Sequence, residues 1–361
     1  MKRLVQVIFR IVLVIGFFLL AALIIFYAKN TLYLESSNER NIAYLKKNKY
    51  PLVEKESKSQ NLDEFFTQEF YTSEVFLLGE NHGFANAQKL DLILLKHLNK
   101  KVGLKYYIAE MDSLRAKKLN TYLEGNESED ELLKQVVLDI GLRIPQQSSI
   151  ELFEKWKQIY IYNKKLPDSL KIKIIGIDKD FDDTTPSISR DSMMVLNFRN
   201  AVSKKNLQNE KFYGLLGYGH VLQEAYGESN YRCFAARLKS NKRYKVQSIV
   251  CYNLDGEVYF PKNPQYPSPE DEKLSSLNDD GPITLVKGIN DLKEVTDENT
   301  MTLFSLVGED SPYHTNQNLA GLKVNFFGPD VLPSNKDIPT TDFFQYIILN
   351  RNSKALTKIG G

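Results

Sequence analysis

Short apolar segments that end at or near a glycine alternate with amphipathic segments from about residue 74 onward. The first of them, Glu74-Val-Phe-Leu-Leu-Gly79, has the pattern of a buried strand and leads into residues 85–100, where apolar side chains recur at helical spacing. Further strands are predicted with helices between them, at 104–110, 172–177, 212–217 and 245–252. Such alternation predicts an α/β domain with a largely parallel central sheet flanked by helices.

Three consecutive helical segments separate the second predicted strand from the third, so we expect a helical insertion at about 113–165. Residues 31–70 are polar and mostly compatible with helix, and we interpret them as a helical stalk that leads into a single domain spanning 71–361. Prolines make 253–280 a loop region. Later apolar runs are predicted to finish the sheet, at 283–286, 322–327 and 343–349.

The first thirty residues differ from the rest of the chain. Residues 11–28 carry no charge and, at about 1.5 Å per residue, reach roughly 27 Å, close to the thickness of a bilayer's hydrocarbon core. We therefore expect residues 1–30 to form a single-pass membrane anchor, with a cleaved signal peptide as the alternative. Lys2, Arg3 and Arg10 favour a cytoplasmic N-terminus, which places the domain outside the cytoplasm, or in the periplasm of a Gram-negative cell.

Composition excludes some classes of partner. Lys+Arg 47 against Asp+Glu 45 gives a formal net charge of +2, so no electrostatic argument favours a nucleic acid. Cys233 and Cys251 lack metal-site spacing and are predicted to pack as small apolar side chains, with an oxidised pair as the alternative. Of the four histidines, His97 and His314 are expected to be structural or solvated.

Ionisable side chains follow the first four predicted strands at the point where each strand ends. They are Glu80 and His82, Glu110 and Asp112, Asp178, and His220. Ligands of parallel α/β sheets bind beyond the carboxyl ends of the strands, so we expect these side chains to share a crevice. A carboxylate at such a place can instead cap the following helix, and for Asp178 this alternative weighs equally.

Two chemistries suit this set of residues. Without a metal, a histidine removes a proton from water while a carboxylate supports it and a cation stabilises the oxyanion. With a metal, Glu80, His82, Glu110 and His220 become mixed nitrogen and oxygen ligands for zinc, manganese or iron. The spacing of these residues along the chain does not decide between the two chemistries.

Several motifs, in this order along the chain, resemble the erythromycin esterase family and its superfamily of haem-binding and TraB-like proteins. The resemblance covers about residues 60–355. It rests on Leu78-Gly-Glu-Asn-His-Gly83, Ala109-Glu-Met-Asp112, Leu119-Asn-Thr-Tyr-Leu-Glu-Gly125, Trp156 with Asn163, Ile175-Gly-Ile-Asp178, Arg190-Asp-Ser-Met-Met-Val-Leu-Asn197, Leu216-Gly-Tyr-Gly-His220 and residues 343–354.

The resemblance implies hydrolysis of a small-molecule ester or lactone without a cofactor. His82 would activate water, Glu110 would support it, and Arg190 and His220 would contact the polarised carbonyl or the leaving group. Glu80, Asp112 and Asp178 are then expected to contact the substrate. The short spacing Gly-Glu-x-His, with only Asn81 before the histidine, is similar to the haem- and iron-binding branch. The alternatives are therefore a haem- or metal-binding protein without catalysis, or a metal-dependent hydrolase or peptidase.

Overall fold

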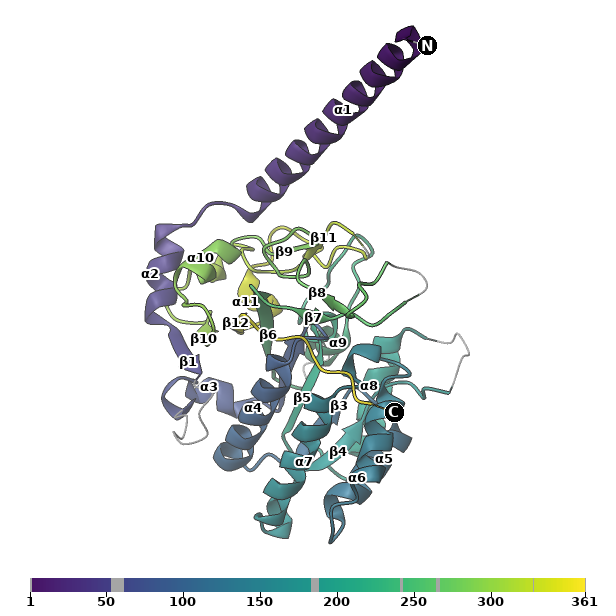
Figure 1. The fold of residues 1–361 in the computed structure, drawn as a ribbon. Helices are drawn as coiled ribbons and strands as arrows, with labels where there is room; N and C mark the ends of the chain where they lie inside the picture. The colour runs from purple at the N-terminus through teal and green to yellow at the C-terminus, as the bar shows by residue number, and fades with distance from the viewer. Residues whose placement is uncertain are drawn as a thin grey trace.

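The computed structural model describes residues 2–52, 62–182, 188–240, 243–263, 267–326 and 328–360. An eight-stranded sheet of order β1-β10-β12-β6-β2-β5-β3-β4 forms its centre (Figure 1). Neighbouring strands are parallel from β12 to β4, whereas β10 is antiparallel to β12 and β1 is antiparallel to β10. The predicted α/β class with a largely parallel sheet is confirmed. The strands of this sheet are β1 (Lys49–Leu52), β2 (Val75–Glu80), β3 (Tyr106–Ala109), β4 (Lys173–Gly176), β5 (Phe212–Gly217), β6 (Val246–Leu254), β10 (Met301–Ser305) and β12 (Tyr346–Arg351).

Helices cover both faces of the sheet. Buried side chains of α4–α7 form one apolar core with the sheet, and those of α2, α8, α9 and α10 form another on the opposite face. The helices are α1 (Lys2–Leu34), α2 (Glu39–Lys47), α3 (Gln68–Thr72), α4 (Asn86–Val102), α5 (Ser113–Glu124), α6 (Asp130–Ile140), α7 (Ile150–Lys164), α8 (Arg190–Lys204), α9 (Phe234–Ser240), α10 (Ile289–Glu294) and α11 (Thr340–Phe343).

Local sequence signals fix where the helices nearest the site begin. The side chains of Asp112, Ser149 and Ser189 accept hydrogen bonds from backbone N–H groups in the first turns of α5, α7 and α8. The helix α4 ends at Gly103, whose φ of 64° is the left-handed conformation that glycine adopts readily. These helix termini place the connections after β2, β3 and β4 at one edge of the sheet.

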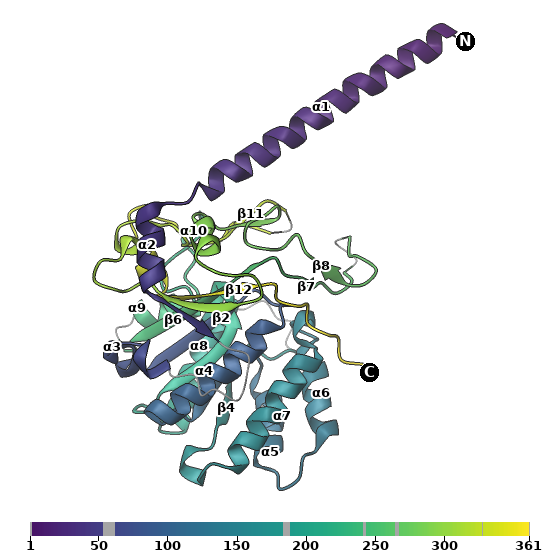
Figure 2. The same cartoon turned by 60° about the vertical axis from the view of Figure 1, so that its left-hand side comes forward.

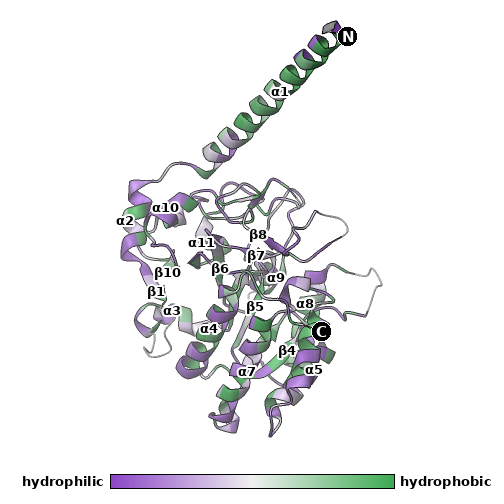
Figure 3. Ribbon diagram, in the orientation of Figure 1, coloured by the Kyte–Doolittle hydropathy of each residue, from purple (hydrophilic) through white to green (hydrophobic). Residues whose placement is uncertain are grey.

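The helix α1 extends away from the domain as a straight rod (Figures 1 and 2). It is apolar along most of its length, as Figure 3 shows, and its residues Arg3–Leu34 are long and apolar enough to cross a membrane. None of its most apolar stretch is buried against the domain. Its length and composition suit either a membrane anchor or a signal sequence.

The segment after α1 differs from the helical stalk expected over 31–70. The helix α2 packs against α10, and β1 joins the central sheet as its edge strand. The apolar side chains of Ile42 and Leu45, which made the segment resemble a helix, are buried in the domain. Pro51 lies within β1, where an edge strand tolerates a residue that cannot donate a backbone hydrogen bond. The described parts of this segment after α1, residues 35–52 and 62–70, therefore belong to the domain.

The strands that finish the sheet also differ in part from expectation. The run 343–349 does contribute β12, but the runs 283–286 and 322–327 do not enter the central sheet. Instead β9 (Thr284–Leu285) and β11 (Lys323–Val324) pair with each other, and Phe327 lies outside the described residues. The strand that the sequence reasoning missed, β10, is short and fully buried. In the proline-rich loop, β7 (Val258–Tyr259) pairs with β8 (Lys273–Leu274).

The edge strand β4 is protected by asparagine side chains from the quoted motifs. The amide of Asn120 bonds both the N–H and the C=O of Ile174, and Asn163 does the same for Ile172. Each amide takes the place that a neighbouring strand would occupy, which satisfies the edge without allowing another chain to pair there. These two motif residues therefore serve the fold.

Candidate active site

The carboxyl ends of four neighbouring strands bring the predicted site residues together. Glu80 ends β2, and Glu110 directly follows β3. Asp178 comes two residues after β4, and a 3₁₀ helix after β5 ends at His220. The structure joins six of the seven predicted residues into one network, namely Glu80, His82, Glu110, Asp178, Arg190 and His220.

Glu110 lies at the centre of this network. Its Oε1 accepts a hydrogen bond from Arg190 Nη2 at 2.7 Å and lies 3.5 Å from His220 Nε2. Its Oε2 accepts from the backbone N–H of Gly217 at 2.7 Å and lies 4.0 Å from His82 Nε2. Burial alone would raise the pKa of this carboxyl, but His220, His82 and Arg190 hold it well below its ordinary value. Glu110 is therefore an anion between three basic groups.

His82 is oriented through its other ring nitrogen. Its Nδ1 lies 3.2 Å from Glu80 Oε1 and 3.1 Å from the amide nitrogen of Gln147, which itself donates to Glu80. Burial lowers the pKa of His82, but the hydrogen bond and charge of Glu80, together with Glu110, outweigh it and leave the pKa raised. Glu80 is 1% exposed, so it supports His82 rather than meeting a ligand from solvent.

Arg190 is the first residue of α8 and is clamped by two carboxylates. Its Nε and Nη2 donate to Asp178 at 2.5–3.2 Å, while Nη2 also donates to Glu110. This forked geometry fixes the guanidinium plane. Burial lowers the pKa of Arg190, but the hydrogen bonds and charges of Asp178 and Glu110 outweigh burial and leave the pKa raised. Asp178 thus anchors the arginine, and its contact with a substrate stays a prediction.

His220 is held by a carboxylate that the sequence reasoning did not place in the site. Its Nδ1 lies 2.7 Å from Asp191 Oδ1, and Asp191 also accepts hydrogen bonds from Tyr231 Oη and from the backbone N–H of Phe234. Burial lowers the pKa of His220, but Glu110 and Asp191 raise it to about 10. His220 is therefore an imidazolium at neutral pH, and Nε2 is the nitrogen that faces Glu110 and Arg190.

Two contributors to the site carried only weak sequence signals. Asp191 follows Arg190 in the first turn of α8, where an acidic residue is normally explained by the helix dipole. Gln147 ends a short 3₁₀ helix that begins at Pro145 inside the helical insertion, far from any strand end. The insertion therefore supplies part of the support for His82.

Asp112 has partners of its own. One oxygen caps α5 by accepting from the N–H of Arg115 at 2.8 Å, and the other accepts from the Arg115 guanidinium at 2.6 Å. The N–H of Phe181 donates to the same carboxylate. These contacts make Asp112 a helix cap, and its contact with a substrate stays a prediction.

The rings of the two histidines both lie against Gly217, at a place that solvent reaches. A Cβ atom placed on Gly217 would lie 3.0 Å from His82 Nε2 and 3.5 Å from a ring carbon of His220. The side chains of His82, His220 and Arg190 are 22%, 16% and 32% exposed, so solvent reaches this place. Because glycine has no side chain, both histidine rings can lie against the end of β5 with their edges partly exposed to solvent.

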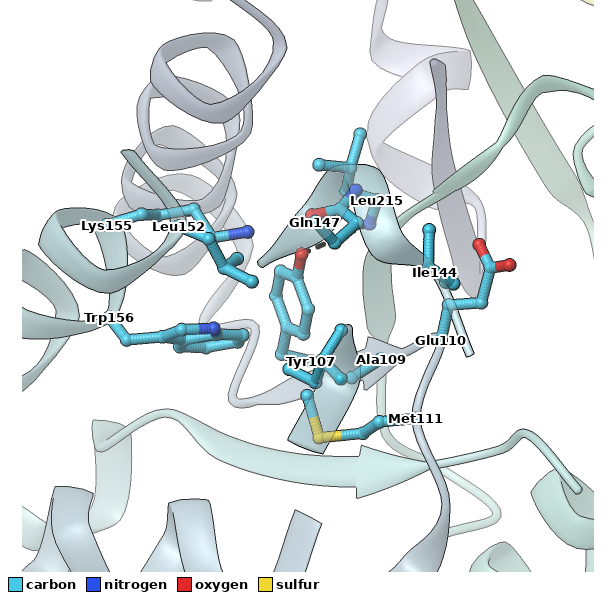
Figure 4. A pocket seen from close by; sticks show the side chains of 11 residues that line it. Tyr107, Ala109, Glu110, Met111, Ile144, Gln147, Leu152, Lys155, Trp156 and Leu215 are labelled. Atoms are coloured by element: carbon cyan, nitrogen blue, oxygen red, sulfur yellow. Dashed lines mark hydrogen bonds between the residues drawn. The ribbon is translucent and has the colours of Figure 1, made fainter. Parts of the chain in front are cut away.

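A cavity of about 40 Å³ lies on the opposite side of Glu110, under Gln147. Figure 4 shows Lys155 and Tyr107 pointing into it, whereas the carboxylate of Glu110 points away. Lys155 Nζ and Tyr107 Oη both donate to Asp91, and Trp156 lines the wall. A volume of this size holds about three water molecules, which suits a hydrated internal cavity.

The remaining histidines and the cysteines are as predicted. His97 is hydrogen-bonded to Tyr71 at 2.8 Å, and His314 lies in a loop against Thr341 and the carbonyl of Gly308. Cys233 and Cys251 are buried and unbridged. None of them contacts the network around Glu110.

The alternative ligands for a metal ion do not form a suitable donor set. In the part of the chain that the structure describes, no group of three or more His, Cys, Asp or Glu side chains is arranged to hold a metal ion. The guanidinium of Arg190 occupies the position beside Glu110 where a cation would be needed, and Asp191 engages one nitrogen of His220. Glu80, His82, Glu110 and His220 therefore do not form a donor set for a divalent cation.

Together, the fold and the network define an α/β protein with a charged cluster of histidines, carboxylates and an arginine at the carboxyl edge of its sheet. The sequence matches no protein-family model and no curated protein. The fold is similar to that of a Bacillus cereus protein, with a TM-score of 0.65, 14% identity, and coverage of 90% of this chain and 100% of that chain.

Two further solved structures share the fold. One is described as a succinoglycan biosynthesis protein, with a TM-score of 0.58, 14% identity, and coverage of 90% of this chain and 100% of that chain. The other is a mutant of the erythromycin esterase EreC in its open conformation, with a TM-score of 0.56, 10% identity, and coverage of 84% and 97%. The resemblance expected from the motifs is confirmed for the fold.

Proposed function

We propose that this protein hydrolyses an ester or a lactone of a small molecule, with His82 as the general base. The observation that carries the proposal is the convergence of His82 Nε2, His220 Nε2 and Arg190 around Glu110, with all three basic side chains partly exposed to solvent. The shared fold with an erythromycin esterase supports the same reaction class.

The geometry suggests a separate catalytic role for each of these groups. His82 Nε2 takes a proton from water, and the carboxylates of Glu80 and Glu110 stabilise the imidazolium that results. The hydroxide attacks the ester carbonyl carbon, and the oxyanion is stabilised by Arg190 and the protonated His220, the two partly exposed cations beside Glu110. His82 then returns its proton to the leaving alkoxide as the carbon–oxygen bond breaks.

A panel of esters, lactones and peptides tests the reaction class. The full chain is assayed with and without a chelator, next to a His82→Asn variant that keeps an amide near Glu80. We expect hydrolysis of at least one ester or lactone that is insensitive to the chelator and falls by about 10²–10⁴-fold in the variant. Equal activity of the two proteins would refute the role of His82, and activity lost on chelation would support the metal-dependent alternative.

We also propose that α1 is an uncleaved membrane anchor with a cytoplasmic N-terminus, which holds the domain outside the cytoplasm. The support is the length and apolar character of α1 and the basic residues Lys2, Arg3 and Arg10 at its start. Extraction of membranes with carbonate should leave the full-length chain in the membrane fraction, and protease added outside the inner membrane should digest the domain. Release of a shortened chain would indicate a signal peptide instead.

A further inference from the structure

A second cleft, of about 590 Å³, lies along the free edge of β4. It is bordered by α5, whose core residues lie on one face of the sheet, and by α8, whose core residues lie on the other. Asp178, the anchor of Arg190, lines one end of it. The volume is that of a small-molecule site, about 300–1,000 Å³, whereas the internal cavity under Gln147 is far smaller. The cleft therefore has room for a ligand and begins where the candidate active site ends.

Small side chains keep the cleft open. Ser113 and Ala116 face it from α5, and Ala201 faces it from α8. Larger residues at these three places would close the two helices over the edge of the sheet. The floor is the strand itself, from Ile174 to Gly176.

One backbone position on this floor has open hydrogen-bonding groups. In the parallel ladder, Lys173 and Ile177 donate to β3, so the N–H and C=O of Gly176 point away from β3. The corresponding groups of Ile172 and Ile174 are taken by Asn163 and Asn120. No described side chain does the same for Gly176, which leaves a donor and an acceptor for a ligand.

The cleft is also positively charged. Lys117, Lys204 and Lys205 line it, and none of the three makes an ion pair with a described residue. Three carboxylates also line it. Asp112 and Asp178 are neutralised by arginines, and Asp180 directly follows Lys179, a fourth lysine of the lining. Lysines at the end of α8 complement the helix dipole, but that explanation does not extend to Lys117, which lies in the middle of α5.

We infer that this cleft binds the part of the substrate remote from the ester, and that this part is a polar chain with an anionic group. The inference rests on the proposed hydrolysis. The side chain of Asn197 contacts the backbone of Asp178, and Lys204 lies seven residues further along α8. At about 1.5 Å per residue, the anionic group therefore lies roughly 10 Å from the active-site end of the cleft.

A pair of esters of equal length tests the inference. Mono-4-nitrophenyl suberate carries a terminal carboxylate, whereas its methyl ester is neutral. We expect the wild-type chain to show a KM about tenfold lower for the charged ester, and a Lys204→Gln/Lys205→Gln variant to lose this preference without a change in kcat for the neutral ester. The matched control is Lys46→Gln/Lys47→Gln, two exposed lysines in the last turn of α2, which should keep the preference.

Binding measured without turnover separates this inference from the proposed function. In titration calorimetry with suberate and with hexyl phosphate, at least one of the two should give saturable binding to the wild-type chain and to the control, and none to the Lys204→Gln/Lys205→Gln variant. Binding that persists in that variant, or no binding of either anion to the wild type, overturns the inference. Saturable binding together with no ester hydrolysis would contradict only the proposed function.

Discussion

The two halves of the central sheet each have an arginine paired with a carboxylate near the ends of their strands, but they use it differently. In the half from β2 to β4, Arg190 is bound by two carboxylates, is one-third exposed and lies 3.4 Å from His220 Nε2. In the other half, Arg351 at the end of β12 is 6% exposed and donates to Asp255 and to the carbonyl of Thr296. The first arginine presents charge to solvent beside histidines, and the second joins loops to the sheet.

The polar residues around each arginine show the same contrast. The ends of β6 and β12 carry Asn253 and Asn350, which bond each other, and Asp279 accepts from the backbone N–H of Asn253. All three are buried. A cluster of amides satisfies the hydrogen-bonding groups of the backbone and the side chains without creating a strong electrostatic field. The cluster around Glu110 instead concentrates charge where a ligand can reach it. The comparison indicates that one half of the sheet gathers partly exposed charged groups, and that the other gathers buried hydrogen-bonded amides.

Exchanging each arginine for lysine should separate these roles. Arg190→Lys keeps the charge but loses the fork to Asp178 and Glu110, so kcat for the cleaved ester is expected to fall by about 10²–10³-fold with little change in Tm. Arg351→Lys should leave kcat near that of the wild type but lower the free energy of unfolding by about 2 kcal/mol, because buried carbonyls lose a charged donor. Steady-state kinetics and thermal unfolding of both variants check this, and the reverse pattern would contradict the comparison.

A methyl group on Gly217 should crowd the place where the rings of the two histidines lie. The backbone at Gly217 has φ of −56°, which alanine adopts without strain, so Gly217→Ala is expected to fold. Its Cβ would lie 3.0 Å from His82 Nε2, where we place the reacting water, and kcat/KM should fall by about 10²-fold. Gly219→Ala is the control, since its Cβ would meet only the hydroxyl of Tyr226. Similar kinetics for both variants would show that the water lies elsewhere.

The pH dependence of hydrolysis should reflect both histidines. Activity rises as His82 loses its proton, at a pH above the ordinary value of about 6.5 because its pKa is raised, and it falls near pH 10 as His220 loses its own. Asp191→Asn removes an anion that holds the His220 proton, so the falling limb should move to lower pH by about 1–2 units. Asp255→Asn, in the other half, should leave the profile unchanged. A pH-stat assay with an alkyl ester or a lactone measures both limbs, and an unmoved limb in Asp191→Asn would remove His220 from the mechanism.

The parts of the fold that the sequence predicted well are those with strong local periodicity. The strands β2–β6 and the helices α4–α9 coincide closely with the expected segments, because apolar runs ending near glycine and helical spacing are local signals. The edge strand β1 and its neighbour β10 were not predicted, because two short strands that pair about 250 residues apart have little local pattern. Their position depends on tertiary pairing.

The site was predictable to the extent that strand ends meet at one edge of a parallel sheet. That rule alone brought Glu80, His82, Glu110, Asp178 and His220 together, and the resemblance added Arg190. The rule could not show which side chains form hydrogen bonds with these residues. Asp191 and Gln147 reach the site from a helix and from the insertion, and only packing in three dimensions shows which nitrogen of each histidine they orient.

The smallest expected effect on kcat is that of a substitution at Asp279, the buried acid in the half of the sheet that contains β6 and β12. Burial raises the pKa of Asp279 to about 8, above the value of about 3.9 expected for the unfolded chain. Between these values the folded state holds a proton that the unfolded state releases, so this group lowers the free energy of unfolding as pH rises from about 4 to about 8.

Asp279→Asn removes this titration while keeping an oxygen that can accept from the N–H of Asn253. We expect the variant to gain several kcal/mol of stability relative to the wild type between pH 4 and pH 8, because each unit of the pKa shift corresponds to about 1.4 kcal/mol, in urea unfolding followed across that range. Asn81 contacts Asp279 and immediately precedes His82, so the substitution could also change kcat. An unchanged kcat in the same variant would show that the substitution alters stability alone. If the two stability curves run parallel from pH 4 to pH 8, Asp279 is ionised in the folded protein, and the contrast between a charged and an uncharged half of the sheet fails.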